Sequence, residues 1–139
     1  MWTAGLEGPG RVKLLGDGEI ELENIDPSGK EFALEVVDVF QKAGLNPSYS
    51  SNVRYSIWRK ACVNGTLNGL CTILDCNIAE FGALPVSESL VKTLISEFAA
   101  VAEKEAIHLD QAEVYTHIAQ TYDPNGIGLH LSLIHISEP

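Results

Sequence analysis

Three polar residues near the middle of the sequence have the types and the spacing that chemistry on a carbonyl group would need. Lys60, Asn64 and Asn68 recur at every fourth position, which places their side chains on one face of a predicted helix. Asparagine is a poor helix former, so two asparagines inside one helix need a reason. A lysine can donate a proton to a developing alkoxide. The spacing therefore indicates a site for a polarised carbonyl or for a sugar and phosphate edge, with a solvated helix face as the alternative.

The distribution of charge points to the same region. The chain has 9 Lys and Arg against 19 Asp and Glu, a net charge of −10, which argues against nucleic-acid binding because that needs a basic face. No acidic residue lies between Asp38 and Asp75. Within this stretch, Arg54, Arg59 and Lys60 form a local basic cluster that would be enough for a phosphorylated small ligand. Chance clustering is the alternative interpretation.

Several other classes of protein are not expected. The sequence has no apolar run long enough to span a bilayer and no visible secretory signal. The cysteines have neither metal-like nor C-x-x-C spacing and are interpreted as reduced core thiols of a cytoplasmic protein: Cys62, Cys71 and Cys76. No metal site is expected, because the histidines lack Cys or Glu partners at ligand spacing: His108, His117, His130 and His135.

The polar face must be positioned by helices. Helical periodicity runs from Asn52 to about Cys76 and returns after Ser87, the predicted N-cap of a helix that ends near Ala106. Asp110 and Glu113 have capping-box spacing and predict a third helix, which Asp123-Pro124-Asn125-Gly126 would end.

The first fifty residues have a mixed pattern. Val12–Leu14 and Ile20–Leu22 alternate with charged residues on either side of Gly16-Asp17-Gly18, which predicts a β-hairpin. Ser28 and Glu31 form a capping-box pattern before an amphipathic helix that ends at Gly44. A short extended segment follows, so the fold class is α+β with an all-helical second part.

The change of pattern places a boundary near residue 50. We therefore expect one part over residues 1–50 and a helical domain over residues 51–130. Residues 131–139 continue no pattern and are similar to translated adapter DNA, so we expect them to be a non-native tail. A frayed native terminus is the alternative.

The run Trp58-Arg59-Lys60-Ala61-Cys62-Val63-Asn64-Gly65-Thr66-Leu67-Asn68 resembles the W-x-K-x-x-x-N-x-x-x-N segment of the ketopantoate reductase (2-dehydropantoate 2-reductase) family. Residues 97–105 are similar to that family's E-x-x-x-V-A helix, and residues 2–22 look like the last strands of its nucleotide-binding domain. The resemblance implies that residues 1–50 are a β-hairpin and helix remnant of a nucleotide-binding α/β domain. Residues 51–130 would then be the family's helical C-terminal domain.

The resemblance also implies roles and partners. Lys60 would protonate the keto oxygen of ketopantoate as hydride arrives from NADPH, in the route to pantothenate and coenzyme A. Asn64 and Asn68 would orient that lysine and bind the substrate's carbonyl and hydroxyl groups. The family's oligomers allow a homo-oligomer here.

The sequence departs from the family in one large respect. The G-x-G-x-x-G motif of nicotinamide sites does not occur, so no cofactor-binding residue is assigned. The chain is therefore expected to be truncated at both ends and inactive alone. The alternatives are part of a paralogous 2-oxo-acid reductase and a non-catalytic helical module for dimerisation or partner binding.

Overall fold

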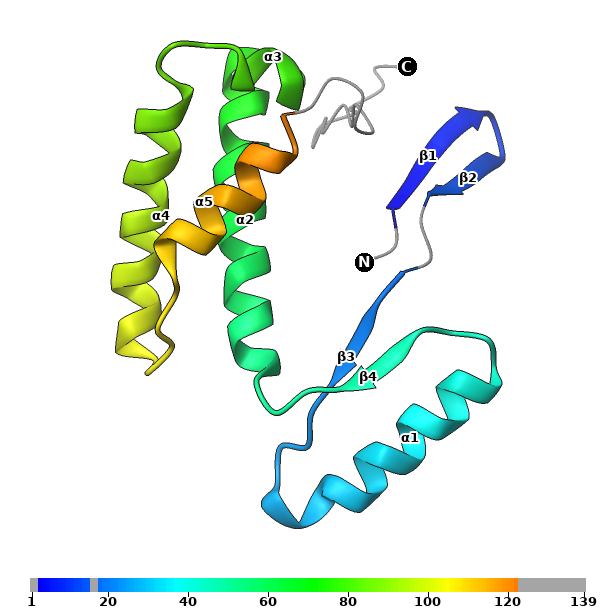
Figure 1. Ribbon diagram of the computed structural model, residues 1–139. Coiled ribbons are helices and arrows are strands. Elements are labelled where there is room, and N and C mark those ends of the chain that lie inside the picture. The colour runs from blue at the N-terminus through cyan, green and yellow to red at the C-terminus, as the bar shows by residue number, and fades with distance from the viewer. Residues whose placement is uncertain (1–2, 16–17, 123–139) are drawn as a thin grey trace. The chain divides into compact units, whose positions relative to one another are not determined.

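The computed structural model describes residues 3–15 and 18–122, and these form two compact units, Met1–Val53 and Arg54–Pro139. Figure 1 labels their elements, which are taken here one unit at a time. The division at residue 50 and the domain limits drawn from the sequence stay predictions. Residues 16–17, the helix break at 123–126, His130, His135 and the tail at 131–139 lie outside the described residues.

The first unit begins with a β-hairpin, but it is not the predicted one. Strand β1 (Thr3–Gly8) pairs antiparallel with β2 (Arg11–Leu15), with Leu6 opposite Val12. The turn falls at Gly8-Pro9-Gly10, where Gly10 has a φ of +72°, a conformation that favours glycine. The prediction that Val12–Leu14 pairs with Ile20–Leu22 is therefore wrong.

Strand β3 (Ile20–Leu22) instead pairs in parallel with β4 (Pro47–Tyr49). Parallel neighbours require a crossover connection, and helix α1 (Lys30–Lys42) provides it, as Figure 1 shows. The unit thus contains a β-α-β arrangement.

The ends of α1 differ in how well the sequence predicts them. Its C-terminal stop is confirmed: Gly44 has a φ of +79°, and the backbone N–H of Leu45 donates to the carbonyl of Phe40. The predicted Ser28–Glu31 capping box is wrong. A 3-10 turn (Pro27–Gly29) precedes the helix, and Asp26 caps this turn by accepting from the backbone N–H of Ser28.

The second unit consists of helices, and in Figure 1 α2 (Val53–Leu74) and α4 (Ser87–Lys104) run antiparallel while α5 (Gln111–Gln120) crosses them. The short α3 (Ile78–Gly82) connects the first two. All four helices and the segment before α5 contribute to one core, whose fully buried side chains include Cys62, Phe81, Val91, Ile95, Val114 and Ile118. This core leaves part of the α2 surface uncovered.

The starts of these helices test the capping predictions. The N-cap at Asp110 is confirmed, because its carboxylate accepts from the backbone N–H groups of Ala112 and Glu113. Ser87 is not an N-cap but the first residue of α4, and its hydroxyl donates to the carbonyl of Gly82. Helix α3 was not expected, although Asn77 and Glu80 form a reciprocal capping box at its start.

Candidate functional site

The three candidate residues all lie on α2, and Lys60 and Asn64 are exposed while Asn68 is half-buried. Their spacing places them on one side of this helix. Within residues 3–15 and 18–122, none of the three side chains has a hydrogen bond or an ion pair. The Lys60 amine and the Asn64 carboxamide are therefore available to a ligand as far as the described structure extends.

Asn68 has one further property that bears on binding. Its Oδ1 atom is buried and has no hydrogen-bond partner in the described part of the chain. A buried acceptor without a donor is costly, and almost all such groups in folded proteins find a partner. The atom has almost no accessible surface, so a ligand hydrogen would reach it only after the Asn68 side chain or its neighbours move.

The remaining sides of α2 are fixed by packing. Its buried residues are Cys62, Thr66, Leu67 and Cys71, all of which follow Lys60 in the sequence. A Cβ atom at Gly65 would lie 2.6 Å from Cζ of Phe98 on α4, so glycine at this position lets the two helices approach closely. Packing thus holds the part of α2 that carries Asn64 and Asn68.

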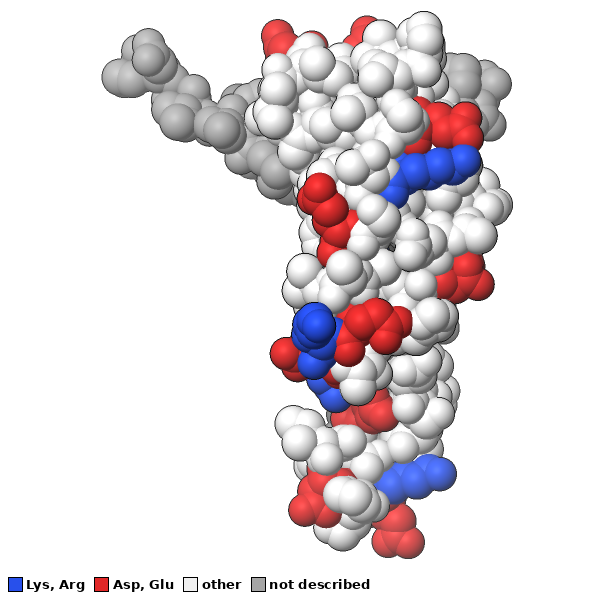
Figure 2. All heavy atoms as spheres, turned by 90° about the vertical axis from the view of Figure 1, so that its left-hand side faces the viewer, with Lys and Arg blue, Asp and Glu red and all other residues white. Residues whose placement is uncertain are grey.

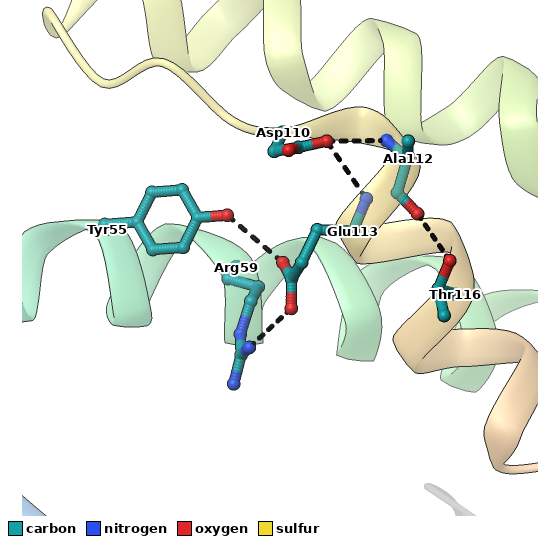
Figure 3. Close-up of polar contacts among 6 residues, drawn as sticks. All are labelled: Tyr55, Arg59, Asp110, Ala112, Glu113 and Thr116. Carbon is teal, nitrogen blue, oxygen red and sulfur yellow. Dashed lines mark hydrogen bonds and ion pairs between the residues drawn. The ribbon is translucent and has the colours of Figure 1, made fainter.

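The part of α2 before Lys60 packs Tyr55 and Trp58 partly against the core and also makes the polar contacts shown in Figure 3. The Glu113 carboxylate on α5 accepts a hydrogen bond from the Tyr55 hydroxyl at 3.1 Å and from the Arg59 guanidinium at 2.8 Å. Burial, followed by the contact with Glu113, raises the pKa of the Tyr55 phenol. Sequence reasoning placed Glu113 only in a capping box, and the spacing of Tyr55 and Arg59 one turn apart was the signal it did not use.

The basic cluster expected from the sequence is mostly neutralised. Arg59 pairs with Glu113, and Arg54 lies 3.7 Å from a carboxylate oxygen of Glu105. Of these three basic residues, only Lys60 has no ion pair in the described structure. Figure 2, a view from the left-hand side of Figure 1, shows acidic side chains with fewer basic ones between them on that face. These observations favour a site built on one ammonium and two carboxamides over a phosphate-binding cluster.

The cysteines are placed as the sequence predicts for core thiols. Cys62 and Cys71 are buried, Cys76 is half-buried, and all three are free. Burial raises the pKa of the Cys71 thiol to about 11, with a smaller contribution from Cys76. A thiol held in its neutral form is a poor nucleophile, so Cys71 is not a candidate for covalent catalysis.

Residues 3–15 and 18–122 also bear on two other kinds of site. No group of three or more His, Cys, Asp and Glu side chains there is arranged to hold a metal ion. None of the helices formed by these residues combines the length and the apolar character needed to cross a membrane.

Comparison with known protein families gives one match, which includes the whole candidate site. The family model described as ketopantoate reductase PanE/ApbA C terminal matches residues 52–126. The 2-dehydropantoate 2-reductase of Lactococcus lactis is 53% identical over 130 residues, which is 94% of this chain and 42% of the relative. The chain thus spans less than half the length of this relative.

Two solved structures match the same share of this chain as the Lactococcus lactis relative does. A protein of Enterococcus faecalis, provisionally assigned as a 2-dehydropantoate 2-reductase, is 97% identical with a TM-score of 0.65. A D-mandelate dehydrogenase, solved with NADH and anilino(oxo)acetate, is 52% identical with a TM-score of 0.84. Each comparison covers 94% of this chain and 42% of the other.

Proposed function

The chain belongs to the ketopantoate reductase family, and from this we propose that it supplies the helical, substrate-binding part of an NADPH-dependent 2-dehydropantoate 2-reductase. The proposal rests on the match of the family's C-terminal model to residues 52–126, which include Lys60, Asn64 and Asn68. Its substrate would be a small 2-oxo acid, ketopantoate, and its product the corresponding 2-hydroxy acid.

Lys60 is proposed as the general acid. Reduction of a ketone adds a hydride to the carbon and a proton to the oxygen, and the nicotinamide dinucleotide would supply the hydride when bound. The Lys60 ammonium is exposed and has no partner in the described structure, so it can donate its proton to the keto oxygen as negative charge develops there.

Asn64 and Asn68 are proposed as positioning and binding groups. A carboxamide nitrogen can donate to a carbonyl or carboxylate oxygen, and a carboxamide oxygen can accept from a hydroxyl. Asn68 would accept from the hydroxyl group that ketopantoate carries at the end opposite its carboxylate, once its Oδ1, buried and unpartnered in this conformation, turns toward the substrate. Asn64 lies one turn from Lys60 and would help to orient the ammonium.

The dinucleotide is not assigned to residues of this chain. The sequence contains no G-x-G-x-x-G motif, and the described residues offer no other phosphate-binding loop that we can identify. The choice of NADPH follows the family resemblance, whereas the D-mandelate dehydrogenase structures hold NADH. We therefore derive no step from contacts to the cofactor.

A second candidate substrate has a specific observation in its favour. The identity to D-mandelate dehydrogenase, 52%, nearly equals the 53% identity to the Lactococcus lactis reductase. Mandelate is the 2-hydroxy acid formed by reducing phenylglyoxylate, so the reaction class and the role proposed for Lys60 are unchanged. The two substrates differ at the far end, where ketopantoate has a hydroxyl group and phenylglyoxylate a phenyl ring.

The test uses a full-length chimaera, in which this chain replaces the matching 130-residue segment of the Lactococcus lactis reductase. Oxidation of NADPH and of NADH is measured with ketopantoate and with phenylglyoxylate. Lys60→Ala should lower kcat by about 10²–10⁴-fold and change KM much less.

Lys104→Ala is the matched control, since Lys104 is exposed in the last turn of α4. A Lys60→Ala variant that keeps at least about a third of the wild-type kcat would remove this residue from the acid role. A folded wild-type chimaera that reduces neither acid would favour a non-catalytic helical module.

A further inference from the structure

Glu113 forms a bridge between two helices that are distant in sequence. It lies in the first turn of α5, and its two carboxylate oxygens accept from Tyr55 and Arg59, which lie 58 and 54 residues earlier on α2. Figure 3 shows the Glu113 carboxylate between these two side chains. The Arg59 and Glu113 side chains are 36% and 40% exposed.

The bridge adds to the core packing that sets the rotation of α2 about its own axis, and it acts at the turn next to Lys60. Tyr55 and Arg59 are one helical turn apart and therefore lie on the same side. Successive residues of an α-helix are separated by about 100° around the axis, so Lys60 cannot share that side. When Tyr55 and Arg59 are bound to α5, Lys60 is turned away from α5, in agreement with its exposure.

In the first part of α2, Tyr55 and Trp58 pack against the core with partly buried rings. The buried residues of the helix all follow Lys60, beginning with Cys62. The turns from Val53 to Lys60 are also held in the described structure by the polar contacts of Arg54, Tyr55 and Arg59. Orientation of the Lys60 turn thus depends on the partial packing of Tyr55 and Trp58 together with hydrogen bonds to α5 and to the end of α4.

The backbone of Glu113 is itself held in place at the start of α5. The Asp110 carboxylate accepts from the backbone N–H of Glu113 at 3.0 Å and so orders the first turn of α5, as Figure 3 shows. The next residue, Val114, is fully buried in the core. A part-exposed ion pair contributes little to stability, so orientation is the larger consequence of the bridge.

We propose that Glu113 is a positioning residue for the reductase reaction, and that it acts through Tyr55 and Arg59 on the orientation of Lys60. This inference rests on the proposed function. Glu113 touches neither substrate nor cofactor in this scheme; it limits the directions in which the ammonium can point. Misplacement of a catalytic group by about 1 Å can cost about 10²-fold in rate.

The test compares Glu113→Ala and Glu113→Gln with wild type in the full-length chimaera. Glu113→Ala should lower kcat by between about 10- and 100-fold, with a change in KM of less than about twofold. Glu113→Gln keeps the shape and one acceptor oxygen, and should retain a kcat between those of wild type and the alanine variant. Glu97→Gln is the control, because Glu97 is exposed on α4.

Exchange of the two charges separates orientation from simple loss of stability. Arg59→Glu and Glu113→Arg should each lower kcat, and the double variant should recover kcat above both, since it restores an ion pair between the same helices. Circular dichroism measures the folded fraction of each variant, and kcat is expressed per folded molecule.

Three outcomes are distinct. An active wild-type chimaera whose Glu113→Ala variant keeps the wild-type kcat overturns the positioning role and leaves the proposed function standing. A loss of activity that only follows the folded fraction, with no recovery in the double variant, also overturns it. An inactive wild-type chimaera overturns the proposed function, and the positioning role with it.

Discussion

Asn68 is the residue of the α2 polar face whose surroundings say most about the ligand. Its buried Oδ1 atom has no partner in the described structure, whereas Asn64 is exposed. Asn68→Ala should raise the KM of the chimaera for ketopantoate by roughly 5–150-fold, because a substrate hydroxyl would lose an acceptor worth about 1–3 kcal/mol. Steady-state kinetics over a range of ketopantoate concentrations measures this.

The same variant distinguishes the two substrates. Phenylglyoxylate has no hydroxyl group for Asn68 to accept from, so its KM should change by less than about threefold. A comparable rise for both acids would show that Asn68 binds the 2-oxo-acid group they share. No rise for either acid would remove Asn68 from substrate binding.

Cys71 is expected to titrate well above its ordinary range. Burial raises the pKa of this thiol from 9.0 to about 11. As the pH rises, the thiol of the unfolded chain therefore loses its proton before the thiol of the folded chain does. The contribution of Cys71 to the stability of the fold is complete below pH 9.0 and declines between pH 9.0 and about 11. The β-carbon NMR shift of isotope-labelled cysteine, followed against pH in the 139-residue chain, reports the pKa directly.

Cys71→Ala assigns the resonance. Without the Cys71 thiol, the free energy of unfolding should also fall less between pH 9.0 and about 11 than it does in wild type. A midpoint at 9.0 would contradict the burial of this thiol.

Two glycines of α2, Gly65 and Gly69, allow a matched comparison of alanine substitutions in one helix. A Cβ atom at Gly65 would meet the Phe98 ring at 2.6 Å, whereas one at Gly69 would have nothing within 4 Å. Gly69→Ala should therefore stabilise the chain by about 0.5–1 kcal/mol through helix propensity. Gly65→Ala should destabilise it by about 1–3 kcal/mol, since the aromatic ring must move or the helices must separate.

Thermal unfolding followed by circular dichroism ranks the three chains. The expected order is Gly69→Ala above wild type above Gly65→Ala. Equal midpoints for the two alanine variants would mean that α2 and α4 do not approach closely at Gly65.

The long helices were predictable from sequence because their periodicity extends over many turns. Helices α2, α4 and α5 all appear where apolar spacing places them, and Asp110 caps α5 as expected. The hairpin around residues 16–18 was wrong because β3 has only three residues and takes its partner from β4, across α1. A turn signal reports local preference, and here a long-range parallel pairing outweighed it. The five-residue α3 is too short to show a period.

For the molecule as a whole, the sequence predicts the polar residues of the site on α2 but not the contact between α2 and α5 that holds them. The stripe of Lys60, Asn64 and Asn68 depends only on spacing along one helix, and the family resemblance supplied its proposed roles. The Glu113 bridge joins side chains that are far apart in the sequence: Arg59 lies 54 positions before Glu113, and Tyr55 lies 58 positions before it. The spacing of Tyr55 and Arg59 places them on one side of α2, but it does not identify Glu113 as their partner, since that contact follows from the packing of α5 against α2.

The last prediction concerns the 139-residue chain by itself, which we expect to have no reductase activity. It spans 42% of the Lactococcus lactis reductase and contains no G-x-G-x-x-G motif, the motif that sets a pyrophosphate on a helix N-terminus. Helix α1 also exposes large apolar side chains, Phe32 at 70% and Val39 at 60%. Each forfeits about 1.5–3 kcal/mol relative to burial, against a usual domain stability of about 5–15 kcal/mol.

The purified chain should therefore bind a hydrophobic dye and show no ketopantoate-dependent oxidation of NADPH. The chimaera should bind less of the dye and should oxidise NADPH when ketopantoate is present. Phe32→Ser should reduce the dye signal if the α1 surface is its source, and Val37→Ser, at a buried position of the same helix, is the comparison. The chain is prepared from a host that lacks its own reductase, so that turnover has one source. Turnover by the pure chain would contradict the prediction and show that residues 1–139 are sufficient for dinucleotide binding without a glycine-rich motif.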